Sequence, residues 1–174
     1  MLTCSCQKGA ANLAEINIVL VEPQIPQNTG NVARTCAATG ATLHLVRPMG
    51  FAVDDKKLKR AGLDYWHLLD IRYYEGLDDF FARTGGPYVF FTSKGGKSYV
   101  DHEYPPGVFL VFGREDAGLP QSMLAAHPQC QARIPMISQA RCLNLSSSVA
   151  VGAYEALRRQ GFVGLMEKGV LSIE

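Results

Sequence analysis

The sequence predicts an α/β protein whose mostly parallel sheet is flanked by helices. Apolar runs of strand length alternate along the chain with segments of helical period, as in strands joined by crossover helices. One run, Val108–Phe112 (VFLVF), is apolar on both faces, which is typical of strands inside a parallel sheet. With 174 residues, of which 47% are hydrophobic, the chain can bury a core of its own and should form about one domain.

The first half of the chain alternates twice between strand and helix. The expected elements are a strand at Ile16–Val21, a helix from Asn28 to about Thr39, a strand at Thr42–Val46 and a helix at Asp54–Ala61. Asn28 is a good residue to cap the start of the first helix, and Gly40 is a good residue to end it. The second helix begins with acidic and ends with basic residues, as the helix dipole favours.

The second half continues the same alternation. The expected elements are a helix at Leu77–Arg83, strands at Tyr88–Thr92 and Val108–Phe112, a helix at Gln121–Ala126, a strand at Ala132–Ile134 and a helix from about Asn144 to Gln160. The last helix has a single apolar face at helical period. The middle of this face consists of the small residues Gly152, Ala153 and Ala156, which allow another backbone to approach closely.

Charge and composition exclude several classes of protein. The formal net charge is +1, so any nucleic-acid partner must be held by a local patch. No apolar run approaches the ~20 residues that cross a bilayer, and the first fifteen residues do not form a signal peptide, so no membrane partner is expected. The five cysteines are irregularly spaced and the four histidines are scattered, which predicts no metal site, no disulfide framework and a cytoplasmic location.

Three loops, each directly after an expected strand, carry the candidate functional residues: 23–34, 112–120 and 133–148. Ligands of open α/β sheets bind at such carboxyl ends of strands. The first loop leads into a helix N-terminus, where backbone N–H groups can meet an anion. The second contains two glycines and three charged residues, and the third ends in Asn144 and serines that can cap the last helix. Each loop alone is also compatible with an ordinary turn or capped helix, so the prediction rests on the three together.

The amino-acid sequences of these loops resemble those of the SPOUT class of RNA methyltransferases, in particular the minimal TrmL- or YibK-like members. Those enzymes methylate the 2′-oxygen of the wobble cytidine or uridine of tRNA. The matching stretches are NIVLVEPQIPQNTGNVARTCAATG (17–40), LVRPMGFAVDDKKLKRAGLDY (45–65), FLVFGREDAGLP (109–120) and RIPM with LNLSSSVAVGAYEALRR (within 133–159). The resemblance implies a methyltransferase domain at 16–162, preceded by a polar leader without an assigned role (1–15) and followed by a C-terminal tail (163–174).

The resemblance also implies a SPOUT fold with a C-terminal trefoil knot and S-adenosyl-L-methionine as the cofactor. The cofactor-binding residues that it implies are Phe91, Gly113, Ile134, Met136, Cys142, Leu143 and Asn144. Relatives usually have serine at the position of Cys142. Since a thiol is a weaker hydrogen-bond donor than a hydroxyl, a backbone contact is the one expected there.

For catalysis the resemblance implies Arg34. Glu115 is a second candidate, because its loop lies at the same carboxyl end of the sheet. The resemblance implies that Arg34 accepts the hydroxyl proton. Because a guanidinium is a poor base, we equally expect Arg34 to stabilise the developing alkoxide or a flanking phosphate. The implied tRNA-binding residues are Asn28, Arg34, Lys56, Lys57, Arg60, Arg114 and Arg141.

The resemblance further implies a homodimer, with the small residues of the last helix and Ala33, Ala37 and Ala38 of the first at a two-fold interface. Two alternatives remain for the function. One is a methyltransferase of the same class that acts on another RNA, such as ribosomal RNA. The other is an RNA-binding protein without catalytic activity.

Overall fold

The computed structural model describes residues 15–52 and 69–169. The strands in these residues are β1 (Ile16–Val21), β2 (Thr42–Val46), β3 (Ile71–Tyr74), β4 (Tyr88–Phe91), β5 (Lys97–Ser98), β6 (Val108–Phe112) and β7 (Gln131–Arg133). The helices are α1 (Pro26–Thr39), α3 (Leu77–Arg83), α4 (Gln121–Ala126) and α5 (Leu145–Arg159), with 3-10 turns η2 (Tyr99–Asp101) and η3 (Pro128–Cys130).

In this described part of the chain, the strands form one seven-stranded sheet in the order β3-β2-β1-β6-β4-β7-β5, and all neighbours are parallel. The predicted α/β fold with a parallel sheet is therefore confirmed. The doubly apolar strand β6 lies between β1 and β4, inside the sheet as expected.

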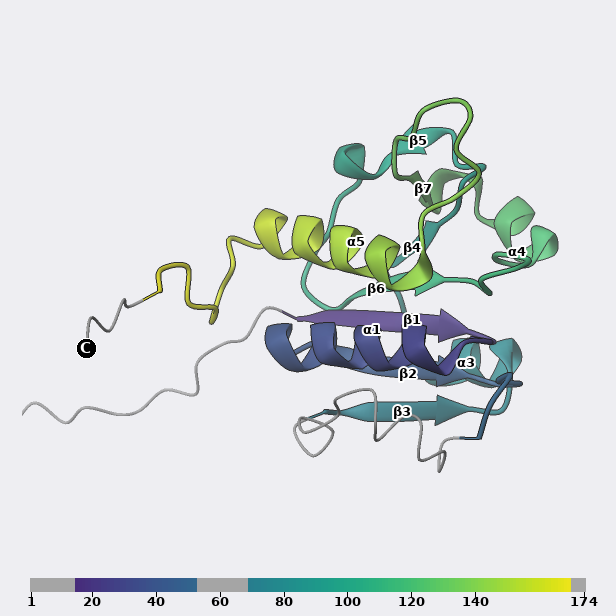
Figure 1. Cartoon of the computed structure of the whole chain (residues 1–174), viewed down its shortest axis with the longest axis horizontal. Coiled ribbons are helices and arrows are strands. Elements are labelled where there is room, and N and C mark those ends of the chain that lie inside the picture. Colours follow the sequence, from purple (N-terminus) through teal and green to yellow (C-terminus); the bar gives the residue numbers. More distant parts are fainter. Residues whose placement is uncertain (1–14, 53–68, 170–174) are drawn as a thin grey trace, which may run out of the picture.

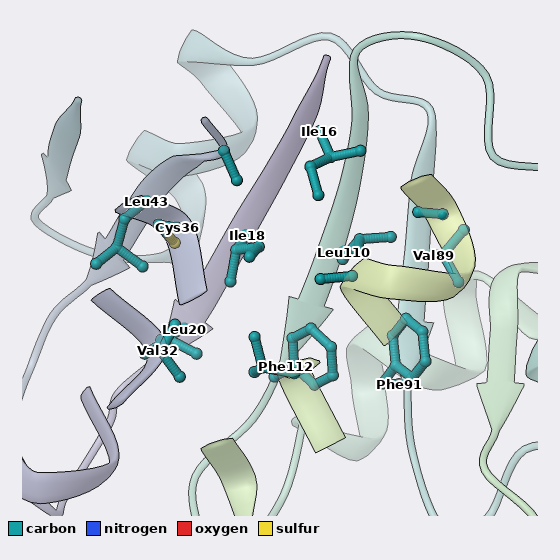
Figure 2. Packing of buried hydrophobic residues seen from close by; sticks show 14 of the residues in the cluster. Ile16, Ile18, Leu20, Val32, Cys36, Leu43, Val89, Phe91, Leu110 and Phe112 are labelled. Atoms are coloured by element: carbon teal, nitrogen blue, oxygen red, sulfur yellow. The ribbon is translucent and has the colours of Figure 1, made fainter. Parts of the chain in front are cut away.

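Helices cover both faces of the sheet. Along β1, Ile16, Ile18 and Leu20 point to one face, whereas Val19 and Val21 point to the other, because side chains alternate along a strand. The first face packs against α1 and α5, which lie side by side across it (Figure 1). Figure 2 shows this layer, in which residues of β1, β4 and β6 meet residues of α1. The second face packs against α3 and α4.

The start of α1 differs from the prediction. The helix begins at Pro26, and Ile25 rather than Asn28 occupies the N-cap position. Proline is well suited to the first turn because the N–H that it lacks would have no partner inside the helix. Asn28 lies inside the helix and is buried. Because its side chain does not cap the helix, its amide is available for the contacts described below. The helix ends as predicted at Gly40, whose φ of 74° is readily adopted by glycine.

Two strands were not expected from the sequence. β3 is a half-exposed strand at one edge of the sheet, and β5 is a two-residue strand at the other edge. Neither forms the apolar run that indicates a buried strand. The helix expected at 54–61 lies outside the described residues.

The small residues of α5 face the interior of their own chain. Gly152, Ala153 and Ala156 are buried, as is Ala33 of α1, and the two helices pack against each other and the sheet. The prediction that these four residues lie at a two-fold interface is therefore wrong. Small side chains let α1 and α5 approach each other and the strands within one chain, and only the outer sides of the helices, including Ala38, stay exposed.

A buried histidine links three strands on the second face. The Nδ1 of His44 lies 2.8 Å from the Tyr74 hydroxyl, and its Nε2 lies 3.0 Å from Oδ1 of Asn17. Asn17 donates through Nδ2 to the Gly107 carbonyl, so its Oδ1 is an acceptor and the Nε2 of His44 carries the proton. Burial lowers the pKa of His44 to about 4. This histidine is therefore a packed neutral side chain.

None of the helices in residues 15–52 and 69–169 is long and apolar enough to cross a membrane. The same residues bring together no group of three histidine, cysteine or acidic side chains that could hold a metal ion.

Candidate cofactor and RNA site

A cavity of about 490 Å³ opens at the carboxyl ends of the central strands. Its walls include residues 91–94 at the end of β4, residues 112–119 at the end of β6 and residues 141–145 at the start of α5, with Ile25 and Asn28 at one side. The cavity lies at the edge where open parallel sheets bind ligands, and its volume is in the range of small-molecule sites.

Two stacked aromatic rings form an apolar part of the wall. The ring centroids of Phe91 and Phe112 are 4.6 Å apart, and the ring planes are inclined by 16°. Helix α5 lies against this pair at Gly152. A Cβ atom there would lie 2.7 Å from the Phe91 ring and 3.2 Å from the Phe112 ring, closer than side chains tolerate. The absence of a side chain at Gly152 thus determines how near the helix comes to the cavity.

A closed turn follows β6. Arg114 and Gly118 exchange two backbone hydrogen bonds of 3.2 and 2.9 Å, which folds the turn back onto the end of the strand. A Cβ atom on Gly113 would lie only 2.1 Å from the carbonyl carbon of Gly118. Position 113 must therefore be glycine for the turn to close at all.

The side chain of Arg114 fastens this turn. Its guanidinium donates two hydrogen bonds of 2.9 Å to the carboxylate of Asp116 and contacts Glu22 at 3.4 Å. Arg114 holds the pKa of Asp116 below its usual range through these hydrogen bonds. The guanidinium is thus already engaged by two carboxylates, which leaves it poorly suited to bind an RNA phosphate.

Glu115 connects the second loop to the first. Its Oε2 accepts a hydrogen bond of 2.8 Å from the backbone N–H of Gln24, and its Oε1 accepts hydrogen bonds of 3.1 Å from the N–H of Ile25 and 3.0 Å from Nδ2 of Asn28. Both oxygens therefore receive N–H donors at the start of α1, where a negative charge is favourable. Since α1 has no N-cap side chain of its own, Glu115 supplies the missing acceptors from another loop.

Asn28 extends this connection to the third loop. Its Oδ1 accepts a hydrogen bond of 2.9 Å from Nδ2 of Asn144. The Oδ1 of Asn144 in turn accepts from the N–H groups of Ser146 and Ser147, so Asn144 caps α5 as predicted. A continuous chain of side-chain hydrogen bonds, Glu115–Asn28–Asn144, thus joins the three loops that the sequence singled out.

The structure brings most of the predicted site residues to this one cavity. All of the predicted cofactor-binding residues contribute to its lining: Phe91, Gly113, Ile134, Met136, Cys142, Leu143 and Asn144. The predicted catalytic residue Glu115 and the predicted RNA-binding residues Asn28, Arg114 and Arg141 also line it.

The other predicted residues are not placed there. Arg34 is exposed on the outer side of α1 and does not line the cavity of its own chain. Lys56, Lys57 and Arg60 lie outside the described residues.

A fourth loop, in addition to the three predicted ones, contributes to the site. Thr92, Ser93 and Lys94 follow β4 and line the cavity, as does Ile25 before α1. The sequence could have identified this loop, because residues 93–96 directly follow the strand expected at Tyr88–Thr92 and include two glycines.

The PMGF stretch, part of the resemblance, also supports the site. The N–H of Gly50 donates a 3.0 Å hydrogen bond to the Pro23 carbonyl. A Cβ atom on Gly50 would lie 2.9 Å from the Cα of Gln24. The loop after β2 therefore packs directly against the first loop, whose next N–H groups bind Glu115.

Comparisons with known proteins agree with this geometry. Residues 15–154 match the model of the SpoU rRNA Methylase family. A Geobacillus stearothermophilus protein, provisionally named tRNA (cytidine(34)-2'-O)-methyltransferase, is 48% identical over 154 residues, which are 86% of this chain and 98% of that protein. A solved structure described as giving insights into the 2-OH methylation of C/U34 on tRNA has a TM-score of 0.81 and 43% identity, over 86% of this chain and 98% of the other.

A more distant solved structure bears on the ligand. The AdoMet-bound rRNA methyltransferase from Sinorhizobium meliloti has a TM-score of 0.75 and 28% identity, and the match covers 85% of this chain and 57% of that one.

Proposed function

The chain belongs to the SpoU rRNA Methylase family, and from this premise we propose that it transfers a methyl group from S-adenosyl-L-methionine to the ribose 2′-oxygen of nucleotide 34, the wobble cytidine or uridine of tRNA. The observation that carries the proposal is that one cavity is lined by every predicted cofactor-binding residue and is joined to the first loop by Glu115, Asn28 and Asn144. The proposal includes a methyltransferase domain at 16–162 with a C-terminal trefoil knot, and a cytoplasmic location, where tRNA is processed.

The residues of the cavity fit S-adenosyl-L-methionine. An adenosine group needs apolar contact on its flat faces and hydrogen-bonding groups at its edges, and the cavity offers both. Phe91, Ile134 and Leu143 supply apolar surface, while Thr92 and Ser148 supply hydroxyl groups nearby. Bound here, the cofactor supplies an electrophilic methyl group to an oxygen nucleophile.

A cavity-filling variant tests this assignment. Cys142 is exposed and lines the cavity, so Cys142→Trp fills the space with a ring without disturbing the core, whereas Cys142→Ser keeps the size of the side chain. Calorimetry should detect binding of S-adenosyl-L-methionine to the wild type and to the serine variant, and none to the folded tryptophan variant. Wild-type affinity of the tryptophan variant would exclude this cavity as the cofactor site.

Within the same proposal, Arg34 is the catalytic residue and Glu115 is a positioning residue. Three N–H donors occupy the carboxylate of Glu115, which leaves it badly placed to accept the proton of a ribose hydroxyl. A guanidinium stays charged at neutral pH and stabilises negative charge that develops on the ribose oxygen. Glu115 contributes by fixing the start of the helix that carries Arg34.

We also propose that the protein is a homodimer whose two chains meet at the outer sides of α1 and α5. Arg34 and Ala38 are exposed on α1, and Val151 and Tyr154 are exposed on α5, where Tyr154 keeps 49% of its surface accessible. An isologous contact through these sides covers the exposed apolar surface of α5. It also accounts for the position of Arg34, because each Arg34 then serves the cavity of the partner chain.

The substrate is tested with synthetic tRNA. The purified protein should methylate an unmodified transcript with cytidine or uridine at position 34, and should not methylate the same transcript with a 2′-deoxynucleotide at that position. If the protein methylates ribosomal RNA and not tRNA, it is a methyltransferase of the proposed kind with a different RNA substrate. Binding of tRNA without methyl transfer to any RNA would reduce the protein to a binding module.

A further inference from the structure

Positive charge gathers beside the cavity although the whole chain is nearly neutral. Residues 84–100 contain Lys94 and Lys97, and residues 117–154 contain Arg133 and Arg141, but neither segment contains an aspartate or a glutamate. The net charge of +1 therefore hides a local separation of charge. Figure 1 shows β5, β7 and the segment that follows β7 together at one end of the molecule.

The fold brings these four cations together. Lys94 and Arg141 line the same cavity. Arg133, on β7, donates a hydrogen bond from Nη1 to the carbonyl of Ser93, the neighbour of Lys94. Lys97 begins the edge strand β5, which pairs with β7 in parallel. We call Lys94, Lys97, Arg133 and Arg141 the basic rim.

The basic rim has no acidic partners, in contrast to five other arginines of the described residues. Arg47, Arg72, Arg83, Arg114 and Arg158 each form an ion pair of 3.4 Å or less with an acidic side chain. Within residues 15–52 and 69–169, no member of the basic rim forms such a pair. Lys94, Lys97 and Arg141 are exposed, so their charges face water.

From these observations we propose that the basic rim binds backbone phosphates of the RNA substrate, and that it replaces Arg114 in this role. The proposal rests on the proposed function, since the RNA must enter at the cavity where methyl transfer occurs. Phosphate contacts of this kind fix the position of an RNA without reading its sequence. Lys94 and Arg141 line the cavity, whereas Lys97 lies outside its lining, on the edge strand β5. The basic rim is therefore longer than a small ligand bound in the cavity would need.

Binding of unmodified tRNA at several salt concentrations tests the proposal. The informative variants are Lys97→Gln, which lies outside the cavity lining, and Lys94→Gln, which lies in it. Arg72→Gln is the matched control, because it removes one charge from the opposite edge strand, β3. Each rim variant should weaken tRNA binding by about threefold at physiological salt and lower the slope of log K against log salt by about 0.7–0.9. The control should keep the wild-type slope.

Several results would overturn the proposal. Wild-type affinity and slope in both rim variants would remove the rim from RNA binding. A Lys94→Gln variant that loses cofactor affinity and keeps tRNA affinity would assign Lys94 to the cofactor. A Lys97→Gln variant that aggregates and binds tRNA normally would make Lys97 only a charge that protects a sheet edge.

The same experiment separates this proposal from the proposed function. If the wild type binds tRNA with a salt slope that the rim variants reduce, the rim is supported even when nucleotide 34 is not the methylated position. If the wild type methylates nucleotide 34 and the rim variants bind normally, the function stands and the rim proposal fails.

Discussion

At the scale of single residues, Asn28 is the contact on which the three loops depend. Asn28→Asp would place a second carboxylate about 3.0 Å from Oε1 of Glu115 and remove the donor between them. The midpoint of thermal unfolding should then fall by roughly 2–4 °C for each kcal/mol of stability lost, as for other domains of this size. Methyl transfer should fall by at least tenfold.

Asn31→Asp is the control, since it adds the same charge to the exposed side of the same helix and should unfold near the wild-type temperature. Equal unfolding temperatures for the two variants would mean that the Glu115–Asn28 contact contributes nothing to the site.

His44 makes the stability of the fold depend on pH. Burial lowers its pKa from 6.5 to about 4, so the unfolded chain binds the proton more readily than the folded chain does. The stability that the fold has with a neutral His44 is complete above pH 6.5 and is lost as the pH falls from 6.5 towards 4. When the pH is lowered from 7 to 5, the free energy of unfolding should therefore fall by about 2 kcal/mol because of this histidine.

Urea denaturation at the two pH values measures this cost, and His44→Gln should remove it from the difference. A variant with the same pH dependence as the wild type would show that other groups cause the loss.

At the scale of elements, the distance between α5 and the cavity is set by Gly152. An alanine inside a helix is normally more stable than a glycine by about 1 kcal/mol. Here the added methyl group meets the Phe91 and Phe112 rings, so Gly152→Ala should destabilise the fold by roughly 1–3 kcal/mol and weaken cofactor binding.

Gly76→Ala provides the comparison, because its Cβ would meet no atom within 4 Å and its backbone is extended. Unfolding free energies and calorimetric affinities measure both variants. A stabilised Gly152→Ala protein with unchanged affinity would show that the rings move aside freely.

At the scale of the whole molecule, the exposed position of Arg34 predicts that each active site needs two chains. Arg34→Ala should retain the cofactor and lose activity by roughly 10²-fold or more, and Cys142→Trp should lose the cofactor. Mixed dimers of the two variants pair an intact cavity with an intact Arg34 from the other chain. An equal mixture should therefore recover about a quarter of the wild-type activity, because half of the dimers are mixed and each contains one working site.

Tyr154→Arg, at the proposed interface, should give monomers in sedimentation and no recovery. An inactive mixture of dimers would place the action of Arg34 within its own chain, and a monomeric wild type would exclude the dimer.

The elements that bury apolar surface, and the loops that follow them, were predictable from the order of the residues alone. Strands such as Ile16–Val21 and Val108–Phe112 and the cap at Asn144 were predicted correctly, because periodicity and capping are local properties. The cofactor-binding residues were identified through the family resemblance and then found around one cavity.

The contacts of individual side chains follow from the three-dimensional fold. The structure shows that Asn28 binds Glu115 and Asn144 instead of capping α1, that Arg114 is held by Asp116, and that Gly152 faces its own sheet. Asn28 is separated from Glu115 by 87 residues and from Asn144 by 116 residues along the chain, so no local pattern of the sequence contains these contacts. The parallel sheet supplies the physical reason: it brings the carboxyl ends of strands from distant segments to one edge, and there their loops meet.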